Sequence, residues 1–137
     1  MSTVIRANIS QKNLWWIPKH RYYELKHFCM QYPDWRKERS ALRDLAPVSN
    51  PELPADGGFG RPVENLVERM TYFNDRIVMV EEAAKLTDDC IGEFILKAVI
   101  SGKSYDAMYA LRPIPCCRDI YYELYRKFFY ILNRLRG

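Results

Sequence analysis

Hydrophobic side chains recur along this chain at steps of three and four residues, which is the spacing of one face of an α-helix. A first helix is predicted between Pro18 and Pro33, because proline fits a helix start and disfavours a helical residue before it. Its predicted buried face comprises Tyr22, Leu25, Phe28, Cys29 and Tyr32. A second helix is predicted over residues 34–45, with Asp34 as its N-cap. Its apolar positions are Trp35, Leu42 and Leu45.

The next segment interrupts this pattern. Residues 46–60, APVSNPELPADGGFG, contain three prolines and three glycines and no periodic apolar positions. Such a composition predicts a linker or surface loop. We therefore divide the chain into residues 1–60, an N-terminal helical hairpin with its linker, and residues 61–137, a long helix with the C-terminal segment.

A long helix is predicted from Pro62, which suits the first helical turn. Its apolar positions alternate steps of three and four and form a seam of about 32 Å. The seam comprises Val63, Leu66, Met70, Phe73, Ile77, Val80 and Ala84. A stripe of this kind requires a partner helix. That partner is either the N-terminal hairpin of the same chain or the same helix of a second copy, which would make a homodimer.

The helix that follows has clear start and stop signals. Asp88 or Asp89 is predicted to cap its first turn, and Gly102 to close it in the glycine C-cap position. Its predicted buried face comprises Ile91, Phe94, Ile95, Ala98 and Val99. Nothing in the chain alternates like a strand for more than a few residues. The predicted fold class is therefore all-α, a helical bundle with a long central helix.

The C-terminal segment predicts a helix-turn-helix. A short helix over residues 104–111 is followed by a break at residues 112–114 and a long helix from Pro115 to about Leu135. The side chains predicted to face inward are Tyr105, Met108 and Leu111 from the short helix, Ile114 from the turn, and Ile120, Leu124, Phe128, Ile131 and Leu135 from the long one.

The distribution of charge favours a negatively charged partner for this segment. The net charge is +4. Residues 1–60 hold nine Lys/Arg against six Asp/Glu, residues 61–111 hold six against nine, and residues 112–137 hold six against two. A polyanion is therefore expected to meet the C-terminal segment rather than the middle of the chain.

Double-stranded DNA is the expected partner of the last helix. Its first turn offers free backbone N–H groups to a phosphate. Lys103, Ser104 and Arg112 are expected to hold the backbone, and Tyr121 and Tyr122 to pack on sugars. The predicted DNA-binding residues are Lys103, Ser104, Arg112, Arg118, Asp119, Tyr122, Arg126 and Lys127. The plain structural alternative is a helical hairpin with a solvated basic face.

Four short patterns in this region also carry a family resemblance. Gly-Lys-Ser-Tyr at 102–105, Ile-Pro-Cys at 114–116, Tyr-Tyr at 121–122 and Phe-Phe at 128–129 resemble the C-terminal end of bacteriophage and prophage regulators of the RinA and ArpU type. Those regulators are similar to region 4 of sigma factors, whose helix-turn-helix binds promoter DNA. The resemblance is clearest over residues 61–137, and it maps Ser104, Tyr105, Ile114, Arg118 and Tyr122 onto the motif.

The resemblance implies a phage-type transcription regulator in the host bacterial cytoplasm. Its partners would be DNA and RNA polymerase or another host protein. The chain departs from the sigma-like pattern at Tyr109, where a small residue is usual, and at Pro113, where glycine is common. Both departures bear on the angle at which the two helices cross.

Acidic side chains in the middle of the chain allow a second function. A phage-encoded interaction protein could inhibit a host nucleic-acid-binding or defence complex by imitating a nucleic-acid backbone. The acids concerned are Glu64, Glu68, Asp75, Glu81, Glu82, Asp88, Asp89 and Glu93. Their plain structural explanation is the solvated side of a long helix.

An enzyme, a cofactor and a metal site are not expected. The chain has two histidines, no glycine-rich phosphate loop and no arrangement of a nucleophile with a base. The four cysteines match no metal-ligand spacing and are expected to be free thiols. No apolar run approaches the roughly 18 to 20 residues that cross a bilayer. A soluble, intracellular protein without a membrane partner is therefore expected.

Overall fold

The computed structural model describes residues 13–45 and 60–137, with side chains from residue 65 onward in the second range. Every regular element within these ranges is a helix, which confirms the all-α class. The helices are α1 (Lys19–Met30), α2 (Tyr32–Leu45), α3 (Gly60–Thr87), α4 (Gly92–Ser101), α5 (Tyr105–Leu111) and α6 (Arg118–Arg136). The predicted linker falls mostly outside the described residues, so the division of the chain at this point stays a prediction.

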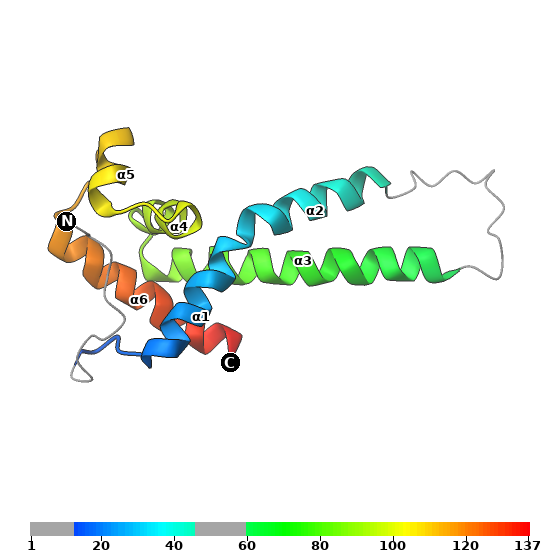
Figure 1. Ribbon diagram of the computed structural model, residues 1–137, viewed down its shortest axis with the longest axis horizontal. Helices are drawn as coiled ribbons and strands as arrows, with labels where there is room; N and C mark the ends of the chain where they lie inside the picture. The colour runs from blue at the N-terminus through cyan, green and yellow to red at the C-terminus, as the bar shows by residue number, and fades with distance from the viewer. Residues whose placement is uncertain (1–12, 46–59) are drawn as a thin grey trace.

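The helices form a head and an arm (Figure 1). The arm is the pair α2 and α3, which pack side by side along much of their length. The head consists of α1, α4, α5, α6 and the C-terminal end of α3. Helix α3 therefore belongs to both parts, and it packs on α2 in the arm and on α4 and α6 in the head.

Local signals account for both ends of α4 and for the start of α5. Gly102 closes α4 with a left-handed φ of 71°, the conformation that glycine adopts without steric cost. The side chain of Ser104 accepts the Ala107 N–H and so caps α5. Asp88 Oδ1 accepts the backbone N–H groups of Cys90 and Ile91 at 2.8 and 2.7 Å. The predicted acidic cap is therefore Asp88, which orders the turn just before α4.

Three predicted helix starts are wrong, all near proline. Helix α3 begins at Gly60 rather than Pro62. Helix α2 begins at Tyr32 rather than Asp34, because Pro33 sits in its first turn, where its missing N–H is not required. Helix α6 begins at Arg118 rather than Pro115. Pro113 and Pro115 keep their preceding residues out of the helical region. The connection after α5 is therefore residues 112–117, longer than the predicted break.

The predicted inner faces of α1 and α4 are confirmed, since all ten of their side chains are buried. The face of α6 was predicted only in part. Ile120 and Leu135 are 54% and 41% exposed, while Phe128 is fully buried. The buried stripe of α6 is Tyr121, Tyr125, Phe128, Phe129 and Leu132. Larger aromatic side chains lie beside the predicted aliphatic positions, and burying them removes more apolar surface from water.

Two more positions predicted to be apolar contacts point to solvent. Leu111, at the end of α5, is 68% exposed, and Leu45, at the end of α2, is 72% exposed. Each lies in the last turn of its helix, where the described neighbours no longer cover it. The other predicted positions of α5 and the turn, Tyr105, Met108 and Ile114, are buried as expected.

The heptad seam of α3 faces its own chain. Ile77, Val80 and Ala84 are buried, and Phe73 packs against the same core. Met70 lies beside Arg39 and Arg43 of α2. The partners of the seam are therefore α2, α4 and α6, which is the intramolecular alternative. Leu66 is only half-buried, and a homodimer through the seam stays a prediction.

The start of α4 lies against the backbone of α3. A Cβ atom at Gly92 would overlap the carbonyl oxygen of Ala84 and lie 2.9 Å from its carbonyl carbon. Neither atom can rotate away as a side chain could. The contact thus requires glycine for its small size, whereas Gly102 is required for its conformation.

Gly92→Ala should consequently lower the free energy of unfolding by about 3 kcal/mol, because α4 must move away from α3. Gly102→Ala should cost only about 1 kcal/mol, since nothing lies within 4 Å of its added methyl group and only the left-handed φ is disfavoured. Denaturant unfolding followed by circular dichroism measures both. Equal losses in the two variants would contradict the close approach of α4 to α3.

Candidate nucleic-acid interface

The α4–α5–α6 corner holds the residues that the sequence predicts to bind DNA. Tyr105 links its parts: the Tyr105 hydroxyl donates to the carbonyl of Cys116 at 2.7 Å, and its ring lies 5.1 Å from that of Tyr121. The backbone N–H of Tyr105 donates to the Tyr122 hydroxyl at 3.3 Å. Ile114 is buried in the connection. The order of the corner is a bracing helix, a short helix, a connection and a long helix, and its action as a helix-turn-helix stays a prediction.

The eight predicted DNA-binding residues fall into three groups. Lys103, Ser104 and Tyr122 lie together around one small cavity, and Lys26 of α1 joins them there. Sequence reasoning missed Lys26, because nothing local indicates that α1 lies against this end of α6.

Arg112 and Arg118 form the second group, and each pairs with an acid of the same chain. Arg112 lies 3.4 Å from Glu93 and over the Phe94 ring, and Arg118 pairs with Asp106. All four charged side chains in these pairs are more than half exposed. Ion pairs so open to water stabilise a fold by about 0 to 1 kcal/mol. A phosphate can therefore replace the carboxylate at little cost.

The third group lies along α6. Arg126 is 3.7 Å from Glu123, one turn earlier, and the Lys127 ammonium lies 5.6 Å from the centre of the Trp15 ring. Asp119 is exposed in the first turn. The predicted position of Tyr121 against DNA sugars is wrong, because this side chain is fully buried.

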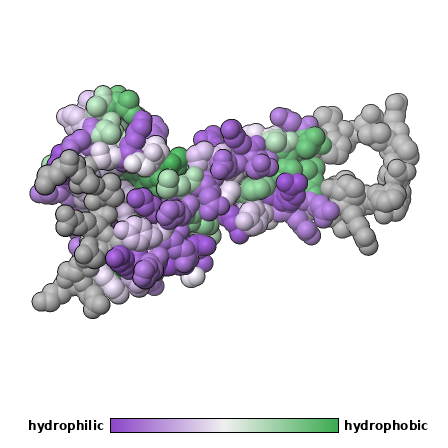
Figure 2. All heavy atoms as spheres, in the orientation of Figure 1, coloured by the Kyte–Doolittle hydropathy of each residue, from purple (hydrophilic) through white to green (hydrophobic). Residues whose placement is uncertain are grey.

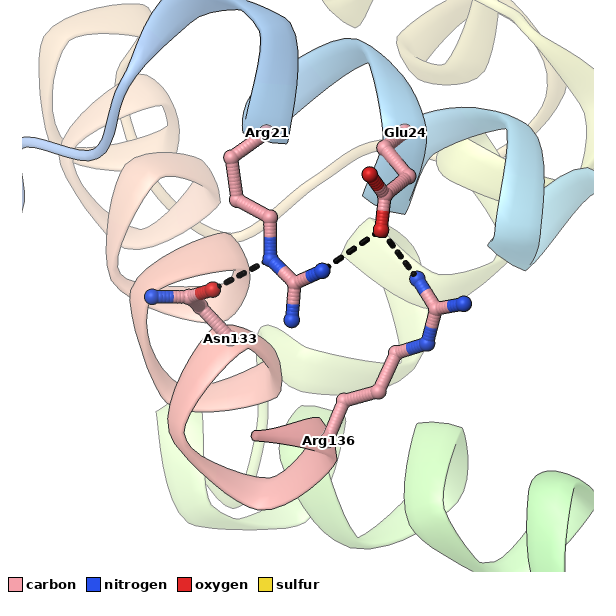
Figure 3. Close-up of polar contacts among 4 residues, drawn as sticks. All are labelled: Arg21, Glu24, Asn133 and Arg136. Atoms are coloured by element: carbon pink, nitrogen blue, oxygen red, sulfur yellow. Dashed lines mark hydrogen bonds and ion pairs between the residues drawn. The ribbon is translucent and has the colours of Figure 1, made fainter.

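Positive charge gathers on α1 and α6 rather than on α5. Helix α6 carries five Lys/Arg against two Asp/Glu and α1 three against one, while α4 and α5 together carry one against two. Figure 3 shows where α1 and α6 meet: Arg21 Nε donates to Asn133 Oδ1 at 2.6 Å, and Glu24 Oε1 accepts from both Arg21 and Arg136. These two arginines hold the helices together.

The outer surface of the corner is partly apolar. Figure 2 shows hydrophobic side chains at the end of the head that α5 forms. Tyr109 and Leu111 of α5 and Ile120 of α6 are each about half exposed or more. The small residue that sigma-like motifs place at position 109 is thus replaced by a ring that points partly into solvent.

Several acids predicted to imitate a nucleic-acid backbone have structural roles. Glu81 accepts a hydrogen bond from the Tyr32 hydroxyl, Glu93 pairs with Arg112, and Asp88 caps a turn. These contacts favour the plain structural explanation for the acidic middle of the chain.

Several buried tyrosines have a raised pKa. Burial raises the pKa of Tyr121 and of Tyr125 above the ordinary value of 10.0, and neighbouring tyrosines add to the effect. Burial together with the hydrogen bond to Glu81 raises the pKa of Tyr32 to about 12. These hydroxyls keep their protons at any ordinary pH.

The described residues offer little to a metal ion. All four cysteines are free thiols, and no cluster of three or more His, Cys, Asp or Glu in the described ranges could ligate a metal. Among the helices described, none has a stretch long and apolar enough to cross a membrane.

Comparisons with protein-family models, with curated proteins and with solved structures find no match to this chain. The functional assignment therefore depends on the residues and contacts of the chain itself.

The raised tyrosine pKa values predict alkaline unfolding. Below pH 10.0 these hydroxyls are protonated in both states, so they make no difference to stability. Between that value and about 12 the unfolded chain releases phenolic protons that the folded chain retains, and the free energy of unfolding falls as pH rises. Circular dichroism and phenolate absorbance should therefore change together in this window.

Two variants test the origin of this effect. Tyr32→Phe should make the loss of stability with rising pH less steep, because one buried phenol no longer titrates. Tyr23→Phe changes an exposed side chain and should leave the profile unchanged. Retention of the fold while every tyrosine titrates near its ordinary pKa would contradict the assignment.

Proposed function

We propose that this protein binds double-stranded DNA through the α4–α5–α6 corner and acts as a phage-type transcription regulator. The observation that carries the proposal is the exposed first turn of α6, which contains Arg118 and follows the connection that begins at Arg112. Both arginines are in weak, exposed ion pairs. A DNA phosphate gains from the free N–H groups of that turn and from both guanidinium groups. Host RNA polymerase or another host protein would be the second partner.

Charge supplies the affinity in this proposal. Arg118 and Arg112 exchange their carboxylate partners for phosphate oxygens, and Lys103 approaches the backbone from the loop between α4 and α5. Asp106 competes with DNA for Arg118, so this acid sets how readily the arginine is released. The affinity should fall steeply with salt, because each neutralised phosphate releases counterions.

The test is a gel-shift series between about 50 and 200 mM salt. Arg118→Ala should weaken binding about tenfold and reduce the slope of log affinity against log salt by about 0.9, the value for one lost phosphate contact. Asp106→Asn should strengthen binding about threefold, since Arg118 is then free for phosphate. These opposite changes would be difficult to obtain from a general loss of structure.

Lys37→Ala is the matched control, because Lys37 is an exposed cation on α2 in the arm. It should leave the affinity and the salt slope unchanged. Equal effects of Lys37→Ala and Arg118→Ala would place the DNA surface elsewhere. If the unaltered protein shows no salt-dependent binding to any duplex, the proposed function is wrong.

The exposed apolar side chains of the corner favour a second candidate, an interaction protein that inhibits a host nucleic-acid-binding or defence complex. Tyr109 and Leu111 would contact the host protein, whereas a charged DNA backbone offers little apolar surface for these side chains. The salt series separates the candidates. Binding through apolar side chains is lost in Leu111→Ser and changes little with salt, and Asp106→Asn leaves it unaltered.

A further inference from the structure

A small cavity lies between α1, the end of α4 and the first half of α6. Its polar lining comprises Lys26, Lys103, Ser104, Tyr121, Tyr122 and Tyr125. The free volume inside is about 10 Å³, which is room for one oxygen-sized atom. Its described lining residues include no carboxylate.

Tyr121 supplies the feature that distinguishes this cavity from an ordinary packing gap. The side chain is fully buried, and its hydroxyl has no hydrogen-bond partner among the described residues. A buried hydroxyl without a partner is unfavourable, because it has lost its hydrogen bonds to water. Tyr121 is also one of the residues that line the cavity.

Two further hydroxyl groups at the cavity have a proton to donate. Ser104 Oγ accepts the Ala107 N–H, and the Tyr122 hydroxyl accepts the Tyr105 N–H. Each therefore uses an acceptor position in the protein and keeps its own O–H. Lys26 and Lys103 add two ammonium groups from different elements. Hydroxyl donors beside two cations are suited to an oxyanion.

We propose that this cavity is the inner end of a phosphate-binding site. One phosphate oxygen enters it and accepts a hydrogen bond from Tyr121, while Lys26 and Lys103 neutralise the oxygens that remain outside. The chemistry is the same for a free phosphate group and for a phosphate of a nucleic-acid backbone. The site is thus inferred independently of the proposed DNA binding, although Lys103, Ser104 and Tyr122 belong to both.

Inorganic phosphate is the direct probe. Added to the whole protein at constant ionic strength, with chloride as the reference anion, it should raise the melting temperature and shift the backbone amide NMR signals of residues 102–104 and 121–122. Tyr121→Phe keeps the ring in the core and removes only the hydroxyl, and it should weaken phosphate binding at least fivefold. Lys103→Gln, at an exposed position, should weaken it by a similar factor.

Tyr23→Phe is the matched control, because it removes an exposed hydroxyl of α1 and should leave phosphate binding unchanged. The inference is overturned if phosphate and chloride act alike, which would mean that a water molecule fills the cavity. It is also overturned if Tyr121→Phe and Lys103→Gln both bind phosphate as the unaltered protein does.

Duplex DNA distinguishes the two sources of phosphate. Competition between DNA and inorganic phosphate, lost in Tyr121→Phe, would support the site and identify the nucleic-acid backbone as its ligand. Phosphate binding without any DNA binding would support the site with a free phosphate group as ligand and would contradict the proposed function alone. DNA binding without a phosphate response in any variant would overturn the site and leave the proposed function standing.

Discussion

The aromatic stripe of α6 is the interaction on which the rest of the structure depends. Rings follow one another from Tyr105 to Tyr121, Tyr125, Phe129 and Tyr22, with centroids 5.1, 6.2, 5.1 and 5.0 Å apart. Tyr105 belongs to α5 and Tyr22 to α1, so the stripe joins the two ends of the head through α6. Buried aromatic side chains contribute both apolar area and favourable ring geometry. Helix α6 is therefore the central helix of the head, packed on α1, α3 and α4. Its first turn stays exposed.

This placement separates two kinds of arginine. Arg136 lies 4.2 Å from the centre of the Phe28 ring and bonds to Glu24 at 3.0 Å, so its removal would loosen α1 from α6. Arg112 and Arg118 instead pair with acids in open water, where the pair adds little stability. Only arginines of the second kind can change partners without disturbing the fold. For this reason the proposed DNA contact is at the start of α6, although most of the basic residues of α6 lie further along it.

Much of the fold could be predicted from the sequence, because it depends on local chemistry. The Gly102 end, the Ser104 cap and the buried face of α4 each follow from a few neighbouring residues. The face of α6 could not be predicted in the same way, since two apolar stripes overlap on it and only packing against α3 and α1 selects the aromatic one. The cavity could not be predicted from the sequence either. Lys26 and Tyr121 line it together only because α1 and α6, which are distant in sequence, pack against each other.

The buried tyrosines differ in whether their hydroxyl groups have a hydrogen-bond partner. Elsewhere in the described core each has a partner: Tyr125 with Tyr22, Tyr32 with Glu81, and Tyr105 with the carbonyl of Cys116. The Tyr121 hydroxyl has no partner among the described residues. Phenylalanine at this position would fill the same space and leave no hydroxyl unsatisfied. Tyr121 lines the cavity to which Lys26 and Lys103 also contribute. A partner from outside the protein would satisfy this hydroxyl, and the two lysines that line the cavity favour an anion for that role.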